Sequence, residues 1–159
     1  MKMSAQHIFD TAPLGSLITF STGEPRPPER FTRILRAWNE QNGMGRLVEK
    51  VAGRDGAYPS PATFALHLGN YGSQGIIVMK VRRIYTITSQ LRFEVAEKPR
   101  TGMVRILSRR DGREELHHLA PDLAAAEAWS AEHRYHDAVI EEVLDPDMVL
   151  PPVRLGRVA

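Results

Sequence analysis

The clearest pattern along the chain lies near its middle, where apolar and polar positions predict two neighbouring β-strands. Residues 76–88 are rich in Ile, Val, Tyr and Thr, whose branched or flat side chains fit a pleated sheet. Beyond them Leu91, Phe93 and Val95 alternate with more polar residues, which gives a strand with one apolar face. Because only a Ser-Gln pair separates the two segments, we expect the chain to reverse there and the strands to be antiparallel.

Shorter β-forming segments on both sides of this pair are predicted to complete a sheet. Two of them are joined by Asp111 and Gly112, which favour a tight hairpin because both central positions of a type I′ turn need positive φ. The glycines from Gly69 to Gly75 also favour a hairpin connection over a phosphate-binding loop, since no helix follows them. The further strands are expected at residues 17–20, 46–51, 63–68, 103–108, 114–119 and 138–143.

Two segments have the periodicity of helices. At residues 28–42 four apolar side chains recur at positions i, i+3, i+4 and i+7, and together they form one stripe of a helix. They are Phe31, Ile34, Leu35 and Trp38. The opposite side of this helix carries Arg30, Arg33 and Arg36, which form either a basic contact face or an ordinary solvated surface. A second helix is expected at residues 122–134, with Asp122 as its N-cap and small alanines that allow close approach to a sheet.

These elements predict an α+β fold, a mainly antiparallel sheet of about six or seven strands with two principal helices packed on it. Residues 1–145 are expected to form a single α+β domain that begins with an irregular segment at 1–14. Residues 146–159 contain three prolines and no periodicity, which predicts a loosely held C-terminal arm. The predicted core comprises Phe31, Ile34, Leu35, Trp38, Phe64, Leu66, Ile77, Met79, Phe93, Val95, Val104, Ile106 and Trp129.

The composition narrows the class of protein. No apolar run approaches the roughly 20 residues that span a bilayer, and the N-terminal residues lack the features of a signal peptide. The chain has no cysteine, so disulfides, thiolate nucleophiles and cysteine-based metal sites are excluded. We therefore expect a cytoplasmic protein of bacterial type that has no association with a membrane.

Charge is distributed unevenly along the chain. Residues 1–113 carry 18 Lys and Arg against 9 Asp and Glu, a net charge of +9, whereas residues 114–159 carry 3 against 10, a net charge of −7. One interpretation is a basic face that binds a polyanion or an acidic protein. The other is that the acidic C-terminal part folds back over the basic part and neutralises it. The sequence leaves both open.

Arginines and lysines at predicted surface positions form the candidate binding site. Those on strands could share one sheet face, those beside Asp111 and Gly112 would surround that turn, and a tyrosine could add an aromatic contact. Because no helix-turn-helix, zinc-finger, KH or RNP pattern is present, nucleic-acid binding would have weak sequence specificity. The candidate residues are Arg30, Arg33, Arg36, Lys80, Arg82, Arg92, Arg105, Arg109, Arg110, Arg113 and Tyr71.

The sequence gives little support for catalysis or for metal binding. It has no GxSxG elbow and no HExxH pattern, so we assign no catalytic residue, no metal ligand and no cofactor. Adjacent His117 and His118 are expected to point to opposite faces of a strand. His133 and His136 are weak candidates for a metal pair.

We therefore predict a small non-catalytic bacterial accessory protein whose basic surface contacts a nucleic acid or an acidic protein partner. The alternative is a small enzyme with a histidine-based site near the loops at 52–61 and 69–75, where His67, His117 or His118 would act as the base. The uneven charge also permits homo-oligomers, in which the basic part of one copy meets the acidic part of another.

Overall fold

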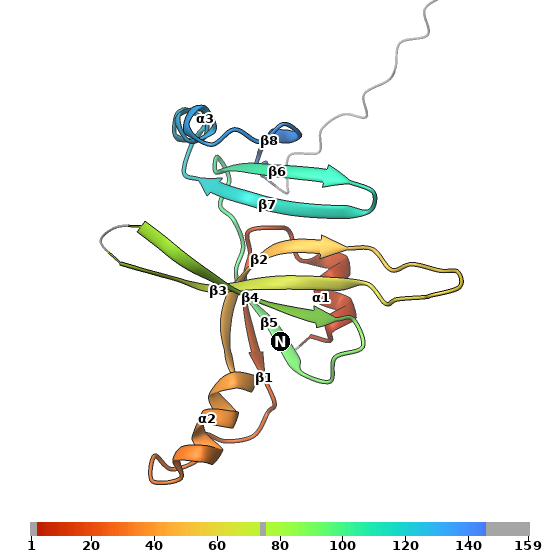
Figure 1. The fold of residues 1–159 in the computed structure, drawn as a ribbon, viewed down its shortest axis with the longest axis vertical. Helices are drawn as coiled ribbons and strands as arrows, with labels where there is room; N and C mark the ends of the chain where they lie inside the picture. The colour runs from red at the N-terminus through yellow and green to blue at the C-terminus, as the bar shows by residue number, and fades with distance from the viewer. Residues whose placement is uncertain (1–2, 74–75, 146–159) are drawn as a thin grey trace, which may run out of the picture.

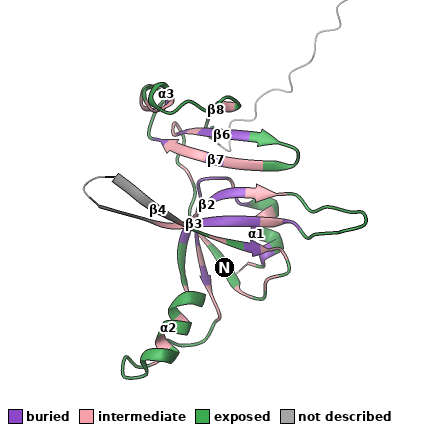
Figure 2. Ribbon diagram, viewed as in Figure 1, coloured by how far each residue is buried: buried purple, intermediate pink, exposed green. Residues whose placement is uncertain are grey.

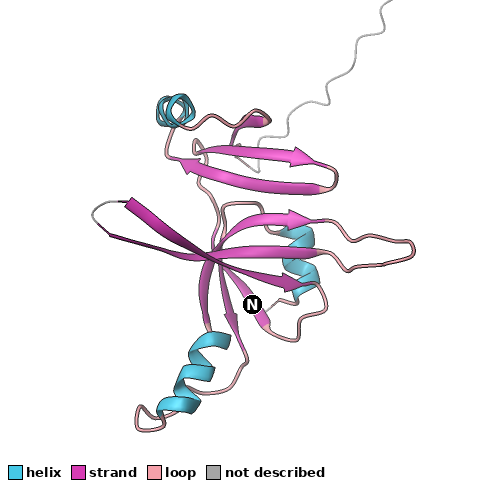
Figure 3. Cartoon of the chain, viewed as in Figure 1, coloured by secondary structure: helices cyan, strands magenta, loops and turns pink. Residues whose placement is uncertain are grey.

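The computed structural model describes residues 3–73 and 76–145, with the backbone alone at 70–73 and 76–80. Within these ranges the chain forms three helices and eight strands, and each pairing of neighbouring strands is antiparallel (Figure 3). The predicted α+β class with a mainly antiparallel sheet is confirmed. The elements are α1 (Ala5–Thr11), β1 (Leu17–Ser21), α2 (Thr32–Gln41), β2 (Gly43–Val51), β3 (Thr63–Ser73), β4 (Ile76–Thr86), β5 (Arg92–Glu97), β6 (Val104–Arg110), β7 (Arg113–Ala120), α3 (Leu123–Glu132) and β8 (Ala138–Glu142).

Strand β2 organises the sheet, because three strands pair with it (Figure 1). One edge of β2 pairs with β3, and β4 follows β3. The other edge is divided: its first half, up to Arg46, pairs with β1, and its second half, from Glu49, pairs with β7. A bulge between Leu47 and Glu49 marks the change of partner. The sheet therefore branches at β2, with β1 and β5 on one branch and β7, β6 and β8 on the other.

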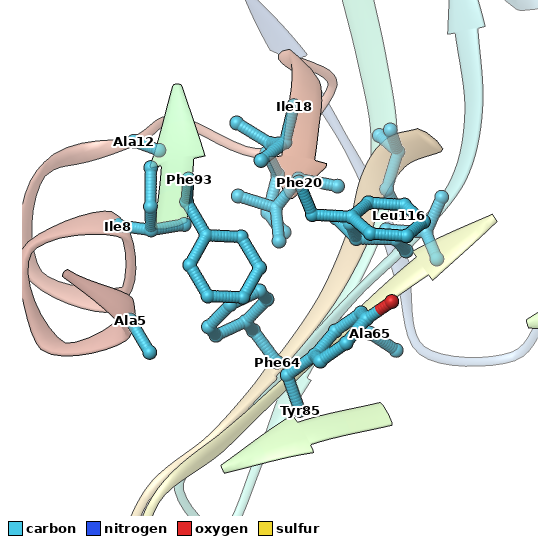
Figure 4. Close-up of a cluster of buried hydrophobic side chains, with 14 of the residues drawn as sticks. Ala5, Ile8, Ala12, Ile18, Phe20, Phe64, Ala65, Tyr85, Phe93 and Leu116 are labelled. Atoms are coloured by element: carbon cyan, nitrogen blue, oxygen red, sulfur yellow. The ribbon is translucent and has the colours of Figure 1, made fainter. Parts of the chain in front are cut away.

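The main core lies inside the branch that β1 to β5 form. Phe64 and Phe93 are fully buried, and their rings meet edge to face with centroids 5.3 Å apart. Tyr85 from β4 also meets Phe93 from β5 at 5.3 Å, so these two strands share one interior (Figure 4). The prediction that they are antiparallel neighbours was wrong, because β4 pairs with β3 and β5 pairs with β1. Helix α1 closes this interior with Ala5 and Ile8, both fully buried. The sequence prediction of an irregular N-terminus was therefore wrong, because Ser4 caps a short helix by accepting a hydrogen bond from the backbone of His7.

A second, smaller core lies between α3 and the strands β6 and β7. Ile106 and Ala126 are fully buried there, and Trp129 packs against them half-buried. As predicted, Asp122 caps the helix, accepting a hydrogen bond from the Ala125 backbone at 2.8 Å. The β6–β7 turn is also as predicted, since Asp111 and Gly112 have φ of 50° and 76°.

Helix α2 stands away from both cores, as its exposed surface shows (Figure 2). Phe31 and Ile34 are 43% and 58% exposed, and Leu35 and Trp38 are only half-buried, so the prediction of these four as core residues was wrong. The periodicity correctly predicted an amphipathic helix, but it could not predict whether the rest of the chain would cover the apolar stripe.

The other predicted core residues divide into three groups. Phe64, Leu66, Phe93, Val104 and Ile106 are buried as expected. Val95 and Trp129 are half-buried, and the side chains of Ile77 and Met79 lie outside the described residues, as does the whole predicted arm at 146–159. Among the described helices, none has both the length and the apolar content to cross a bilayer.

Candidate functional site

Five of the ten predicted basic residues are engaged in ion pairs, mostly with the acidic C-terminal part. Arg109 lies 2.8 Å from a carboxylate oxygen of Glu141 and 3.9 Å from Glu114. Arg105 lies 3.1 Å from Glu141 and also donates to the carbonyl of Leu14. Glu141 on β8 and Glu114 on β7 therefore offset the charges of Arg105 and Arg109 on β6.

The remaining arginines of this part of the sheet are paired in the same way. Arg113 lies 2.7 Å from Glu49, Arg82 lies 3.0 Å from Glu115, and the weaker contact between Arg110 and Asp137 is 3.8 Å long. For these residues the second interpretation of the uneven charge is supported, because carboxylates C-terminal to residue 113 form most of the pairs. A continuous basic face across the sheet is not formed by them.

Three further candidates are set apart from this group. Arg92 lies on β5 opposite Ser21, and its guanidinium packs against Gly23 in the loop after β1. Tyr71 and Lys80 have backbone positions in β3 and β4, but their side chains lie outside the described residues.

The three arginines beside and on α2 keep their charges available. Arg30, Arg33 and Arg36 are exposed, and in the described part of the chain none of them forms an ion pair. Arg30 lies over the ring of Phe31 at 4.8 Å. We call the exposed set Arg30, Phe31, Arg33, Ile34 and Arg36 the α2 surface. It combines positive charge with apolar side chains that are exposed in the described fold.

A shallow cavity adjoins the α2 surface. It has a volume of about 440 Å³ and lies between α2 and β4, with Leu35 and Arg36 on one side and Arg83 on the other. Arg83 donates a hydrogen bond to the carbonyl of Glu40 at the end of α2, so β4 holds the helix at its C-terminus.

Tyr85 lies near Arg83 on β4. Burial raises the pKa of Tyr85, while Arg83 acts in the opposite direction. Among the described residues the Tyr85 hydroxyl has no hydrogen-bond partner of normal geometry.

A second, more enclosed site lies on the other side of the sheet. This groove of about 530 Å³ opens where β7 leaves β2. Its sheet wall carries Arg46, His67 and Arg82, which are successive register partners on β2, β3 and β4. Its other wall carries side chains of β7, of α3 and of the segment after α3. We call it the histidine groove, lined by Arg46, Val48, His67, Arg82, Met103, Leu116, His117, His118, Leu119, Trp129, His133 and Tyr135.

A β-bulge places His117 and His118 in the same groove. Ile106 lies opposite His118 and Leu107 lies opposite Leu116, so His117 is an extra residue on β7. In a regular strand adjacent side chains point to opposite faces, which was the sequence expectation. The bulge overturns that expectation, and no local residue pattern in the sequence predicts it.

Parallel rings line the wall that β7 and α3 form. Trp129 stacks on His118 at 4.8 Å and 2°, and on His133 at 4.1 Å and 8°. Tyr135 lies parallel to Trp129 at 5.9 Å and stacks on His117 at 4.0 Å. Burial, followed by the charge of His133, lowers the pKa of His118, so this ring favours its neutral form.

Ser108, His117 and Asp137 form a cluster that sequence reasoning missed. The Ser108 hydroxyl lies 2.6 Å from Nε2 of His117 and donates to a carboxylate oxygen of Asp137 at 3.0 Å. A hydroxyl has one proton, so while Ser108 donates to Asp137 it must accept from His117, which then cannot act as its base. Ser108 is also only 9% exposed. The cluster fixes the His117 ring instead of activating a nucleophile, and its hydrogen bond lowers the pKa of Asp137.

Two other sites considered from the sequence are a metal site and a catalytic site beside the loops at 52–61 and 69–75, and the described residues form neither of them in that arrangement. No group of three or more potential metal ligands occurs there, and the groove is not lined by described residues of the loops at 52–61 and 69–75. The groove does contain His67, His117 and His118, the three histidines named for the alternative enzyme.

Comparison with known proteins gives one match. The family model described as "Uncharacterised conserved protein UCP036055" matches residues 3–147. Neither a curated protein nor a solved structure matches the chain.

Proposed function

The chain belongs to the family described as Uncharacterised conserved protein UCP036055, and we propose that it is a non-catalytic binding protein whose α2 surface contacts an acidic protein partner. The observation that supports this most is the exposure of Phe31 and Ile34 beside arginines that have no carboxylate partner in the described fold. An apolar helix stripe in water is unfavourable unless something covers it, at about 25 cal/mol for each Å² of apolar surface.

The mixture of side chains favours a protein over a nucleic acid. Arginine and aromatic residues are enriched in the centres of protein interfaces, where they supply most of the binding energy. A phosphate backbone would match the arginines but would leave the aliphatic side chain of Ile34 without a complementary group. An acidic segment with its own apolar residues matches both features, as in the helix-in-groove and related modes of peptide recognition.

The size of the helix limits the strength of this contact. The ten residues of α2 span about 15 Å. A helix of this length is too short to bury, by itself, the roughly 800 Å² per partner of a standard interface. We therefore expect either a transient complex or an interface that extends from α2 into the cavity beside Arg83. The arginines would mainly accelerate association and make it sensitive to salt.

Site-specific photo-crosslinking tests the proposal. A photoreactive amino acid at position 34 in cells that produce the protein should capture one acidic protein, whereas the same group at the exposed Glu127 on α3 should not. The purified partner should then lose at least about tenfold in affinity with Ile34→Ser or with Arg33→Gln, by the typical cost of an interface anchor. Crosslinks to nucleic acid alone, or the same products from both positions, would contradict the proposal.

The enzyme alternative has weaker support. A groove does surround His67, as that alternative requires. The buried Ser108, which contacts His117 beside the groove, donates its proton to Asp137 and is therefore not activated by His117. The groove's stacked rings and arginines are better suited to holding a ligand than to moving a proton at a reacting atom.

A further inference from the structure

The histidine groove is a second site, separate from the α2 surface, with the dimensions of a small-ligand pocket. Its volume of about 530 Å³ lies within the usual range of roughly 300–1,000 Å³ for such pockets. Val48, Leu116 and Leu119 give it apolar surface, and polar groups approach from two walls. A cavity of this kind is the usual setting for recognition of a small molecule.

The sheet wall carries two arginines that are suited to an anion, Arg46 and Arg82. Arg46, His67 and Arg82 lie across three neighbouring strands, so their Cα atoms span about 10 Å. Arg46 is held by a hydrogen bond to the carbonyl of Gly15 at 2.6 Å, and Arg82 by Glu115. These hydrogen bonds hold both guanidinium groups in place. Because a guanidinium has five N–H donors, each arginine still has donors left for a ligand.

The charges on this wall do not cancel completely. Glu115 offsets Arg82, and the neighbouring Arg113 has Glu49 as its own partner at 2.7 Å, so these four charges balance. Arg46 has a carbonyl as its hydrogen-bond partner and forms no ion pair within the described ranges. The wall is therefore positive, and the oxygens of a phosphate match the geometry of a guanidinium fork.

The opposite wall is suited to a planar ring. The planes of His118, Trp129, His133 and Tyr135 are within 8° of parallel in the three pairs that contain Trp129. Tyr135 is 45% exposed and His133 is exposed, so the stack is open to an added ring. Nucleobases stack favourably on aromatic side chains of this kind.

We propose that the histidine groove binds a mononucleotide, with the base along the ring stack of Trp129 and Tyr135 and the phosphate at Arg46 and Arg82. The base requires the ring wall and the phosphate requires the sheet wall, so a sugar phosphate or an uncharged aromatic compound satisfies only one of them. The reduced basicity of His118 is consistent with a neutral imidazole that hydrogen-bonds a base at neutral pH.

Tryptophan fluorescence gives a direct test. The chain has two tryptophans, and Trp38 lies on α2, so a Trp38→Phe protein reports on Trp129 alone. Titration of this protein with AMP, GMP, CMP and UMP should give saturable quenching by at least one of them. Two partial ligands are then compared with that nucleotide: its own nucleoside and inorganic phosphate. Each should bind at least about tenfold more weakly than the nucleotide, because each lacks the contacts of one wall.

Variants then assign the two walls. Arg46→Met should weaken the nucleotide about tenfold or more and leave the nucleoside unchanged, with partial recovery in Arg46→Lys, while Tyr135→Leu should weaken both. Arg54→Met, at an exposed arginine outside both the groove and the α2 surface, is the matched control and should change neither. Equal binding of free phosphate, much tighter binding of an oligonucleotide, or no quenching with thermally stable protein would each overturn the proposal. The partner proposal for α2 is tested by other residues and would stand or fall independently.

Discussion

Arg113 donates two hydrogen bonds to a single carboxylate oxygen of Glu49, from Nε at 3.2 Å and from Nη2 at 2.7 Å. The Glu49 side chain is only 12% exposed, and in the β2–β7 register it lies directly opposite Glu115. Facing carboxylates repel each other across a sheet. Arg113 lies within 3.6 Å of Glu115 as well, so its charge allows β7 to pair with the second half of β2.

Removal of Arg113 should therefore destabilise the fold. We expect Arg113→Met to lower the free energy of unfolding by about 1–3 kcal/mol, because Glu49 is left nearly buried without its donor. Arg110→Met on the same hairpin is the control, since Arg110 is 73% exposed and its ion pair is 3.8 Å long. Its effect should stay below about 0.5 kcal/mol. Urea denaturation measures both, and equal losses would contradict the role given to Arg113.

The exposure of α2 predicts that two isoleucines respond differently to truncation. Ile106 is fully buried in the core under α3, so Ile106→Ala should cost about 2–5 kcal/mol. Ile34 is 58% exposed, and Ile34→Ala should change stability by less than about 0.5 kcal/mol. Thermal or chemical denaturation compares them. A large loss from Ile34→Ala would mean that the α2 stripe is covered within the folded chain.

Close packing at Gly45 gives a steric prediction. A Cβ atom there would lie 2.9 Å from the Cβ of Leu66 and 3.1 Å from the carbonyl oxygen of His67. These atoms belong to the neighbouring strand and cannot move easily, so Gly45→Ala should cost about 1–3 kcal/mol. Gly69 on β3 is the matched control, because an added Cβ meets nothing within 4 Å. Gly69→Ala should be neutral or slightly stabilising, and a similar loss at both positions would contradict the packing at Gly45.

The environment of His118 predicts a pH dependence of stability. Burial, with the charge of His133 as the second cause, lowers the pKa of His118 in the folded state below its ordinary value of 6.5. The unfolded chain then binds the proton first as pH falls, so stability decreases from about pH 6.5 downward until the folded-state pKa is passed. Above that range His118 contributes no pH dependence.

Replacement of His118 should weaken this dependence of stability on pH. His118→Gln should reduce the fall in Tm between pH 7.5 and pH 5.5, while His136→Gln at an exposed position should leave it unchanged. A separate loss of stability is expected near pH 4 and below. The hydrogen bond from Ser108 lowers the pKa of Asp137 in the folded state, and the stabilisation from this bond disappears when Asp137 is protonated. An unaltered slope in His118→Gln would contradict the assignment.

Local patterns in the sequence were sufficient for most of the secondary structure. Alternation at Phe93 and Val95 predicted β5, the Asp111-Gly112 pair predicted the β6–β7 turn, and Asp122 predicted the start of α3. Each of these signals depends on neighbours in the chain. The exposure of Phe31 and Ile34 depends instead on which elements are near α2 in space, and a periodic stripe carries no information about that.

The candidate sites were harder to predict for the same reason. Arg105 and Arg109 were assigned to a basic surface, but Glu141, more than thirty positions away in sequence, neutralises them in the fold. The histidine groove depends on a bulge at His117 and on the separation of β7 from β2, and both are determined by strand register. Register follows from tertiary packing, so only the structure brings Arg46, His67 and Trp129 into one cavity.

The divided edge of β2 also affects the chain while it is being synthesised. β1 precedes β2 and β3 follows it closely, so these partners are available soon after β2 leaves the ribosome. The partner residues on β7 begin only at Arg113, so a nascent chain presents open backbone donors and acceptors at Glu49 to Val51 until that strand has been made. Unfinished copies are thus most prone to associate with each other at this short stretch, and release of β7 closes it.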